Sequence, residues 1–377
     1  MKRMKLLIPG PVELSPDVLQ AMARPPMGHR TSDFEEILED CWRNLKNIFQ
    51  TKNDVLIITG SGTSAMDAAI SSTMNEGEEI ICIGGGKFGE RFIEIANAYG
   101  LKPGEVEVEW GDAVALEEVE GVIAESSAKA ITLTHNETST GVVHNAKAVG
   151  KIAREYGLLY IMDGITSVGG DEVKADAWGV DICITGSQKC LAAPPGLAMM
   201  SVSDKAWGVI DEKGRSNYYL DMAAYRRALR KRTTPYTPSV SLIYGLRVAL
   251  RKVVEEGLEA RVKRHRALAK ATREAFKAMN IELFPREAIA SNTVTALKIP
   301  EGLTDDDIRG RMKREHGILI AGGQAQLKGK IFRIGHMGNV GYSEIIDALT
   351  SLESVLKKSG HYLEPGSGLK AAQKIFK

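Results

Sequence analysis

The stretch Leu158-Leu159-Tyr160-Ile161-Met162-Asp163 decides the fold, because five consecutive apolar residues end directly on a carboxylate. A continuous apolar run of this length is typical of a strand that is buried on both faces of a parallel sheet. Alternating strands and helices predict an α/β fold whose central sheet is mostly parallel and covered by helices on both faces. Similar runs recur along the chain, separated by stretches with helical spacing, at residues 55–58, 80–83, 130–133, 182–184 and 197–202.

The pattern changes after about residue 250. A long helix rich in arginine, lysine and alanine is expected over 258–279, short strands over 293–297 and 332–335, and a closing helix over 343–356. We therefore predict an N-terminal arm (1–15), a large domain (16–256) and a smaller C-terminal α+β domain (257–377). The sequence after Ser359 contains Glu-Pro-Gly-Ser-Gly and is expected to be a loop.

The composition is that of a soluble globular protein, and it excludes several classes of partner. The chain has 377 residues, with 49 Lys and Arg against 48 Asp and Glu, so its net charge gives no reason to expect nucleic acid or an anionic membrane. Its four cysteines are scattered, without the spacing of a disulfide framework or a metal site. We find no signal peptide or transmembrane run, and we expect a cytoplasmic protein without a bound metal.

The sequence Gly60-Ser61-Gly62-Thr63 follows the apolar run 55–58 and opens a helical stretch. A helix N-terminus offers free N–H groups and positive potential, and glycines let the backbone approach an anion closely. The hydroxyls of Ser61 and Thr63 would add donors. Because the lysine of a P-loop is missing, the pattern favours a cofactor monophosphate over a nucleotide triphosphate; a capped helix without a ligand is the alternative.

Two ionisable residues follow neighbouring strands of the predicted sheet. Asp163 ends the run 158–162, and Lys189 follows the run 182–184 in the sequence Gly186-Ser187-Gln188-Lys189. The carboxyl ends of parallel strands face a common crevice, where desolvation makes a lysine amine nucleophilic enough to form a Schiff base. A carboxylate for a pyridinium nitrogen, a lysine for an aldehyde and a phosphate cradle together predict pyridoxal 5'-phosphate. Taken singly, Asp163 would cap a turn and Lys189 would lie on the surface.

A second glycine-rich motif, Gly84-Gly85-Gly86-Lys87-Phe88-Gly89, satisfies G-x-G-x-x-G between a predicted strand and a predicted helix. Acidic residues lie about 20 positions further on, as in a dinucleotide-binding fold. A dinucleotide-dependent oxidoreductase is therefore an alternative, and a tight turn without a ligand is the simpler interpretation.

The chain resembles class V aminotransferases of the alanine/serine–glyoxylate and serine–pyruvate group. The resemblance extends from Pro9-Gly10-Pro11 to about Leu356 and implies an aspartate-aminotransferase-like fold (fold type I). Its specific pieces are Gly60-Ser61-Gly62-Thr63, His135-Asn136-Glu137-Thr138-Ser139-Thr140-Gly141, Asp163, Gly186-Ser187-Gln188-Lys189, Ala193-Pro194-Pro195-Gly196, Thr237-Pro238 and Phe332-Arg333-Ile334-Gly335.

The resemblance implies a role for each matching residue. Lys189 resembles the Schiff-base lysine, which also moves the proton, and Asp163 resembles the partner of the pyridine nitrogen. Arg333 matches the arginine that binds the substrate α-carboxylate, with Gly10 also at the substrate. The remaining matches are cofactor contacts: Phe88 stacked on the ring, Thr138 beside its phenolic oxygen, Ile165, and the phosphate contacts Ser61, Gly62, Thr63, Gln188 and Thr237.

In the resemblance Thr237 comes from the neighbouring subunit, which implies a homodimer with shared active sites. The implied reaction moves an amino group from alanine, serine or aspartate to glyoxylate, pyruvate or 2-oxoglutarate, and phosphoserine is a further candidate. A lyase or desulfurase of the same fold is an alternative, but no cysteine follows Cys190 to serve as its nucleophile. We also consider Arg30 or His336 as a contact for a second acidic group on the substrate.

Overall fold

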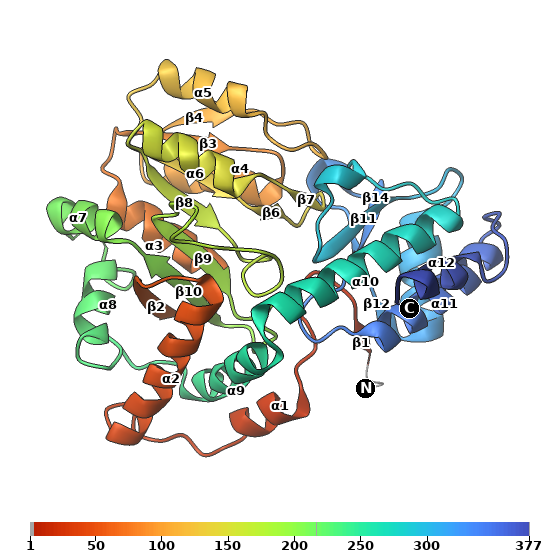
Figure 1. Ribbon diagram of the computed structural model, residues 1–377, viewed down its shortest axis with the longest axis horizontal. Helices are drawn as coiled ribbons and strands as arrows, with labels where there is room; N and C mark the ends of the chain where they lie inside the picture. The colour runs from red at the N-terminus through yellow and green to blue at the C-terminus, as the bar shows by residue number, and fades with distance from the viewer. Residues whose placement is uncertain (1–3, 216, 377) are drawn as a thin grey trace.

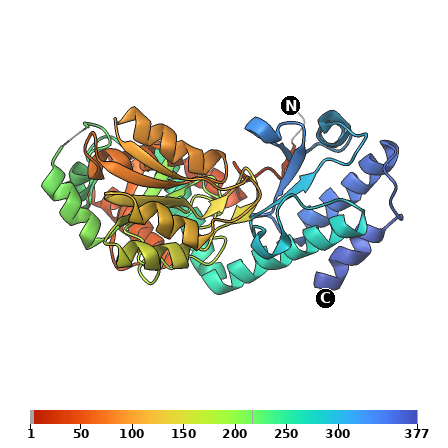
Figure 2. The same cartoon turned by 90° about the horizontal axis from the view of Figure 1, so that it is seen from above.

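The computed structural model describes residues 4–215 and 217–376, which form a larger and a smaller lobe (Figures 1 and 2). The larger lobe is built on a seven-stranded sheet. Strand β10 is antiparallel to both of its neighbours, and the other pairs are parallel, so the predicted mostly parallel sheet is confirmed. In sheet order its strands are β2 (Asp54–Thr59), β10 (Leu197–Val202), β9 (Ile182–Gly186), β8 (Leu159–Asp163), β5 (Ala130–Thr134), β3 (Glu79–Ile83) and β4 (Lys102–Val106).

Each of the six predicted apolar runs contributes a strand to the large sheet. Its seventh strand, β4, was not predicted from the sequence. Its sequence, Lys-Pro-Gly-Glu-Val, has no apolar run. It lies at the edge of the sheet, beside β3. Proline and glycine are tolerated at an edge because one side of the strand has no partner to bond.

Successive residues of the central strands point into two different cores. Ile81, Tyr160 and Met162 belong to one core, while Ile80 and Ile161 belong to the other, and all are fully buried. This two-sided burial explains why the strands are continuous apolar runs. The first core is covered by α1 (Pro16–Met22), α2 (Ser32–Phe49), α5 (Leu116–Ala124), α6 (Ala146–Glu155) and α9 (Val240–Glu256), and the second by α3 (Gly62–Thr73), α4 (Lys87–Ala98), α7 (Asp204–Lys213) and α8 (Met222–Leu229).

The smaller lobe packs helices against a three-stranded antiparallel sheet of order β11-β14-β13. Its strands are β11 (Val294–Lys298), β14 (Ile331–Gly335) and β13 (Ala321–Gly322), and its helices are α10 (Leu258–Ala278), α11 (Tyr342–Lys358) and α12 (Ser367–Phe376). The N-terminal arm reaches this lobe through β1 (Lys5–Leu6), which pairs in parallel with β12 (Ile318–Leu319). Short elements complete the chain: the hairpin β6 (Asn136–Glu137) and β7 (Val142–Val143), π-helical turns at Asp306–Gly310 and Met312–His316, and 3-10 turns at Glu287–Ile289 and Ala325–Leu327.

The prediction of a loop after Ser359 is wrong from residue 367 onward, where α12 forms and packs on α10 and α11. Ala372 is fully buried, and Leu369 and Ile375 pack against the same core. Gly368 lies inside the helix, at a point where a Cβ atom would be only 2.9 Å from the sulfur of Met279. The glycine therefore permits a close helix contact here instead of ending the helix.

The two lobes are joined by α9 and α10, which follow one another through Gly257 (Figure 1). This glycine has a φ of +81°, a conformation that favours glycine. The change of direction at Gly257 supports the domain boundary that we propose at residue 257. None of the helices in the described part of the chain is long and apolar enough to cross a membrane.

Candidate active site

Asp163 and Lys189 lie at the same end of the large sheet, where the carboxyl ends of its parallel strands meet. Asp163 ends β8, and Lys189 follows β9, which is the parallel neighbour of β8. The loop 187–196 returns from β9 to the antiparallel β10 and is closed at its base, where the N–H of Ser187 donates to the carbonyl of Leu197 (3.0 Å). The Ser187 hydroxyl also donates to the carbonyl of Pro194 (2.6 Å). The sheet itself thus holds the loop that carries Lys189.

The amine of Lys189 is partly buried beneath the N-terminal arm, where it donates a hydrogen bond to the carbonyl of Pro9. Burial lowers its pKa to about 8; Cys190 and Asp163 oppose this shift, while Arg333 and Arg91 add to it. A lysine with this pKa has a substantial uncharged, nucleophilic fraction near neutral pH.

Gly10, predicted at the substrate, lies against the Lys189 side chain. Its φ is +97°, and a Cβ at this position would be 2.4 Å from Cδ of Lys189 and 2.8 Å from its amine. Any larger residue would therefore meet the lysine. The arm narrows the space around the reactive amine.

Asp163 is fully buried, and its Oδ1 accepts a hydrogen bond from the N–H of Ile165 (2.7 Å). Burial raises the pKa of this carboxyl to about 7; the Ile165 N–H lowers it, Glu137 raises it, and Arg91 and Lys189 lower it. A cation placed beside the carboxyl would restore its ionised form. Asp163 is therefore suited to hold a protonated ring nitrogen.

The predicted phosphate cradle lies at the N-terminus of α3, which begins at Gly62. Ser61 occupies the N-cap position in an extended conformation, and its side chain makes no capping bond. A Cβ on Gly62 would be 2.4 Å from Cδ1 of Ile165, so Ile165 packs directly on the cradle. The side-chain oxygen of Gln188 is buried and has no hydrogen-bond partner among the described residues.

The turn before α4 presents Phe88, and its glycines accommodate protein atoms. Oε2 of Glu137 accepts hydrogen bonds from the N–H groups of Phe88 and Gly89 (3.0 Å each). A Cβ on Gly86 would be 2.3 Å from Cγ of Glu137, and one on Gly89 would be 2.6 Å from the carbonyl of Gly84. Close packing therefore accounts for these glycines without a dinucleotide.

Two charged residues of the site, Glu137 and Arg91, were missed as functional residues. Glu137 is fully buried; besides the turn, it accepts bonds from the N–H and hydroxyl of Ser139 (2.9 and 2.5 Å), and burial raises its pKa. Arg91 donates to the Thr63 hydroxyl (3.1 Å), and its guanidinium lies 4.7 Å from the centre of the Phe88 ring. Two features of the sequence could have indicated them. Glu137 is the one carboxylate in a motif of small and polar residues, and Arg91 lies one helical turn after Phe88.

Arg333 projects from β14 toward the larger lobe. It donates to the carbonyl of Gly322 from Nε (3.0 Å) and Nη2 (2.6 Å), and Nη1 donates to the carbonyl of Thr138 (2.7 Å). Burial lowers its pKa to about 10. Carbonyls hold its guanidinium, and none of the ion pairs found in the described part of the chain involves it, so its charge is available to a substrate carboxylate. The hydroxyl of Thr138 lies 3.1 Å from that of Thr166.

Two further predicted residues, Thr237 and Arg30, lie in or against the segment 233–239. Thr237 is exposed near the end of β2, where the N–H of Ser239 donates to the Thr59 hydroxyl (3.3 Å). Arg30 donates to the hydroxyl of Thr233 and the carbonyl of Thr234 (2.6 Å each).

His336 does not fit the hypothesis of a cationic contact. It is fully buried, its Nε2 lies 2.9 Å from the Thr295 hydroxyl, and burial lowers its pKa to about 3. It is therefore uncharged at neutral pH.

The cysteines do not support the desulfurase alternative. All four are buried. Burial raises the pKa of the Cys190 thiol to about 12, and this thiol donates to the carbonyl of Thr166 (3.2 Å).

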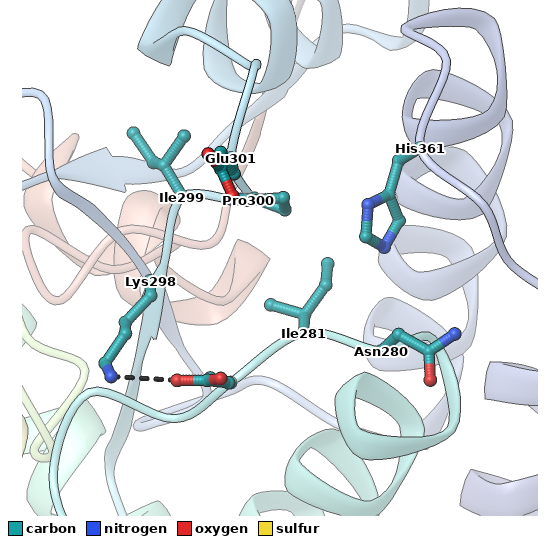
Figure 3. Close-up of a pocket in the computed structure, with 8 residues that line it drawn as sticks. Asn280, Ile281, Lys298, Ile299, Pro300, Glu301 and His361 are labelled. Atoms are coloured by element: carbon teal, nitrogen blue, oxygen red, sulfur yellow. Dashed lines mark hydrogen bonds and ion pairs between the residues drawn. The ribbon is translucent and has the colours of Figure 1, made fainter.

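A separate surface pocket of about 420 Å³ lies in the smaller lobe, between the end of α10, β11 and the segment after α11 (Figure 3). It contains none of the predicted site residues. Lys298 pairs with Glu282 (2.8 Å), and Nε2 of His361 lies 2.8 Å from the carbonyl of Met279. Because these polar groups already have partners within the protein, we assign no ligand-binding site to this pocket.

The sequence pattern described as "Aminotransferase class-V" matches residues 17–338. The chain belongs to the class V aminotransferase family. It is 49% identical, over 98% of its length and 97% of the relative's, to "Uncharacterized aminotransferase MJ0959" of Methanocaldococcus jannaschii. It is 40% identical to "Soluble hydrogenase, small subunit" of a Synechococcus strain (98% of both chains), and 33% identical to a serine–glyoxylate aminotransferase of Arabidopsis thaliana (98% and 94%).

Among solved structures, the chain superposes on the ureidoglycine–glyoxylate aminotransferase of Bacillus subtilis with a TM-score of 0.96. The two are 33% identical, and the match covers 100% of this chain and 98% of the other. This class V aminotransferase therefore has fold type I and depends on pyridoxal phosphate, as predicted.

The residues around Lys189 fit this cofactor. The N-terminus of α3 offers N–H donors and hydroxyls to a phosphate, with the guanidinium of Arg91 beside them. The buried carboxyl of Asp163 and the partly buried amine of Lys189 match a ring nitrogen and an aldehyde. The buried, unpartnered oxygen of Gln188 also lies beside Lys189 in the chain.

Proposed function

We propose that this enzyme transfers the amino group of a small amino acid, such as alanine, serine or aspartate, to a small 2-oxo acid, such as glyoxylate, pyruvate or 2-oxoglutarate. The observation that carries the proposal is the position of the Lys189 amine, which is partly buried at the carboxyl end of the sheet strands and donates to the carbonyl of Pro9, where burial lowers its pKa to about 8. Several relatives carry glyoxylate in their names as one of two substrates, which supports glyoxylate as an acceptor.

Bound pyridoxal phosphate supplies an electron sink for the electrons that remain when the Cα–H bond of the substrate breaks. The Nζ atom of Lys189 would anchor the cofactor and, once free, would carry the proton from Cα of the substrate to C4′ of the cofactor. The carboxylate of Asp163 keeps the ring nitrogen protonated. Ionisation of this buried carboxyl is favoured once a cation faces it.

The other site residues bind and orient. We assign the phosphate to Ser61, Gly62, Thr63 and Gln188, the ring face to Phe88, the ring edge to Thr138, and packing against the cradle to Ile165. Arg333 pairs with the α-carboxylate of the amino acid, since its guanidinium is already oriented by two carbonyls. The arm at Gly10 limits the size of the substrate, because this residue lies against the lysine.

We also propose a homodimer in which Thr237 of the partner subunit completes the phosphate site. In this chain Thr237 is exposed, and its segment lies beside the strand that leads to the cradle. Sedimentation of the cofactor-loaded enzyme tests the dimer. A monomer that keeps full transaminase activity would refute the shared site.

The experiment that tests the reaction is a set of half-reactions. Alanine, serine and aspartate are each mixed with the loaded enzyme, and the loss of the visible cofactor band is followed; glyoxylate, pyruvate and 2-oxoglutarate are then tested for its return. We expect a small donor and a small acceptor to complete the cycle. No exchange with any pair would refute the proposed substrate class.

Borohydride reduction of the loaded enzyme, followed by peptide mapping, tests the anchor. The expected result is a cofactor mass on the peptide that contains Lys189. A Lys189→Ala variant that transfers amino groups at the wild-type rate would refute the assigned role.

A further inference from the structure

A cluster of charged side chains, one of them buried and two partly buried, lies where α9 meets α10. We call it the hinge cluster, and it consists of Glu256, Arg261 and Arg264. Glu256 is the last residue of α9, and its carboxylate accepts hydrogen bonds from both arginines: from Nη1 of Arg261, and from Nε (2.7 Å) and Nη2 (3.1 Å) of Arg264.

The two arginines also bind main-chain carbonyls beside the active site. Nε of Arg261 donates to the carbonyl of Gly169 (2.8 Å), and its Nη2 donates to that of Cys190 (2.5 Å). Cys190 directly follows Lys189, so this bond holds the peptide group between Cys190 and Leu191, one residue beyond the reactive lysine.

Arg264 binds the loop that follows β14, the strand of Arg333. It donates to the carbonyls of Gly338 (3.0 Å) and Val340 (2.6 Å). This loop touches the lysine segment directly, since a Cβ on Gly338 would be 3.3 Å from the carbonyl oxygen of Lys189. The hinge cluster therefore ties the backbone at Lys189 to the loop after Arg333.

The burial of Arg261 is better explained by the positions of the groups that it binds than by a gain in stability. Its exposed fraction is 3%, and burial lowers its pKa. A buried ion pair often stabilises a fold no more than well-packed apolar residues of similar volume would. A guanidinium whose Nε, Nη1 and Nη2 all bind fixed acceptors, however, defines the positions of those acceptors.

We propose that Arg261 is a positioning residue for amino transfer, which fixes the backbone at Cys190 and so places the Lys189 amine relative to the carboxylate-binding Arg333. This inference rests on the proposed roles of Lys189 and Arg333. Misplacement of a reacting group by about 1 Å can reduce a rate by about 10²-fold.

Replacement of Arg261 by methionine keeps much of the volume and removes all three donors. The loop at Lys189 then loosens and admits water. Because burial is the main cause of the lowered pKa, the pKa of the amine rises from about 8 toward its ordinary value of 10.5. The Cys190 thiol moves with the loop, and the other groups that face the amine stay in place: Asp163 from β8, Arg333 from β14, Arg91 from α4 and the Pro9 carbonyl.

The test measures the amine directly, in the full-length chain freed of pyridoxal phosphate. Trace acetylation at a series of pH values, read by mass spectrometry of the Lys189 peptide, gives the pKa of the amine. We expect a higher pKa for Arg261→Met than for the wild type, with a fall of about 10²-fold in kcat/KM of the loaded enzyme. Arg261→Lys, which keeps the charge and can bind one carbonyl, should recover part of both losses.

Arg266→Met is the matched control, because this arginine lies on the same helix with its side chain 54% exposed and 3.5 Å from Asp171. It should leave the pKa and kcat/KM unchanged. If Arg261→Met lowers only the melting temperature and leaves the Lys189 pKa and kcat/KM at wild-type values, Arg261 is structural and the inference is wrong. If Arg261→Met does not fold, Arg264→Met and Arg261→Lys are measured by the same criteria.

Failure of the proposed function is distinguishable. It would appear as a loaded wild-type enzyme that exchanges amino groups with none of the donor and acceptor pairs. The acetylation measurement does not depend on that reaction.

Discussion

Gly10 and Lys189 lie so close that a Cβ atom on residue 10 would be 2.4 Å from Cδ of the lysine. The N-terminal arm therefore contributes directly to the space in which the reactive amine moves. A residue larger than glycine at position 10 would therefore clash with the side chain of Lys189, which lies 179 positions later in the chain.

Gly10→Ala is expected to lower both stability and activity. The φ of +97° costs an alanine about 1–3 kcal/mol, and the new methyl group displaces the lysine. Gly77→Ala is the matched control, because Gly77 has a φ of +82° with open space around its Cβ position. Urea unfolding should show a loss for both variants, while half-reaction rates should fall for Gly10→Ala alone. Equal rates for the two variants would contradict the contact.

Asp163→Asn is expected to stabilise the cofactor-free chain near neutral pH. The carboxyl has a pKa of about 7 in the folded state and 3.8 in the unfolded state, so the folded state binds its proton more tightly. Wild-type stability therefore falls as the pH rises through this interval, by about 1.4 kcal/mol for each pH unit between the two pKa values as an upper bound. Asparagine removes this loss.

The measurement is thermal unfolding of both cofactor-free proteins at about pH 4 and about pH 8. The advantage of Asp163→Asn should appear at the higher pH and vanish at the lower one. An advantage of the same size at both values would argue against a buried, protonated carboxyl. The loaded variant should show slow half-reactions, because asparagine carries no charge to hold the ring proton.

Arg91→Met is expected to weaken retention of the cofactor by about tenfold, which corresponds to about 1.4 kcal/mol. Arg91 donates to the hydroxyl of Thr63 in the cradle, and its charge lies over the Phe88 ring. Lys87→Met is the control on the same helix, since Lys87 pairs with Glu94 at the surface. Equilibrium dialysis against pyridoxal phosphate distinguishes the two, and equal affinities would exclude a role for Arg91.

Glu137→Gln is expected to destabilise the fold by about 1–3 kcal/mol. Each carboxylate oxygen of Glu137 accepts two bonds, one pair from Phe88 and Gly89 and the other from Ser139. The amide of glutamine would turn its NH₂ group toward one of these pairs of donors. Glu282→Gln, which affects a surface pair with Lys298, is the control and should unfold like the wild type.

The sequence predicted the features that depend on local patterns. The six apolar runs became six strands because two-sided burial demands continuous apolar residues. Asp163 and Lys189 followed from their positions at strand ends. The helix N-terminus at Gly62, to which we assign the phosphate, followed from small and hydroxyl residues before a helical stretch.

What the sequence did not predict depends on tertiary contacts. Strand β4 forms at a sheet edge from a sequence that contains proline and glycine. Helix α12 forms because α10 covers its apolar face, and the G-x-G-x-x-G motif accommodates Glu137. The two carbonyls that Arg261 binds lie 92 and 71 positions away in the chain, so no local spacing could connect them.

The antiparallel strand β10 beside β9 has a consequence for how the enzyme can diversify. Because loop 187–196 leaves and re-enters the same sheet, an insertion or deletion within it would shift Lys189 against the strands or break the closing bond between Ser187 and Leu197. The length of this loop must therefore stay constant in any relative that keeps the lysine in the same place, whereas its exposed side chains are free to change.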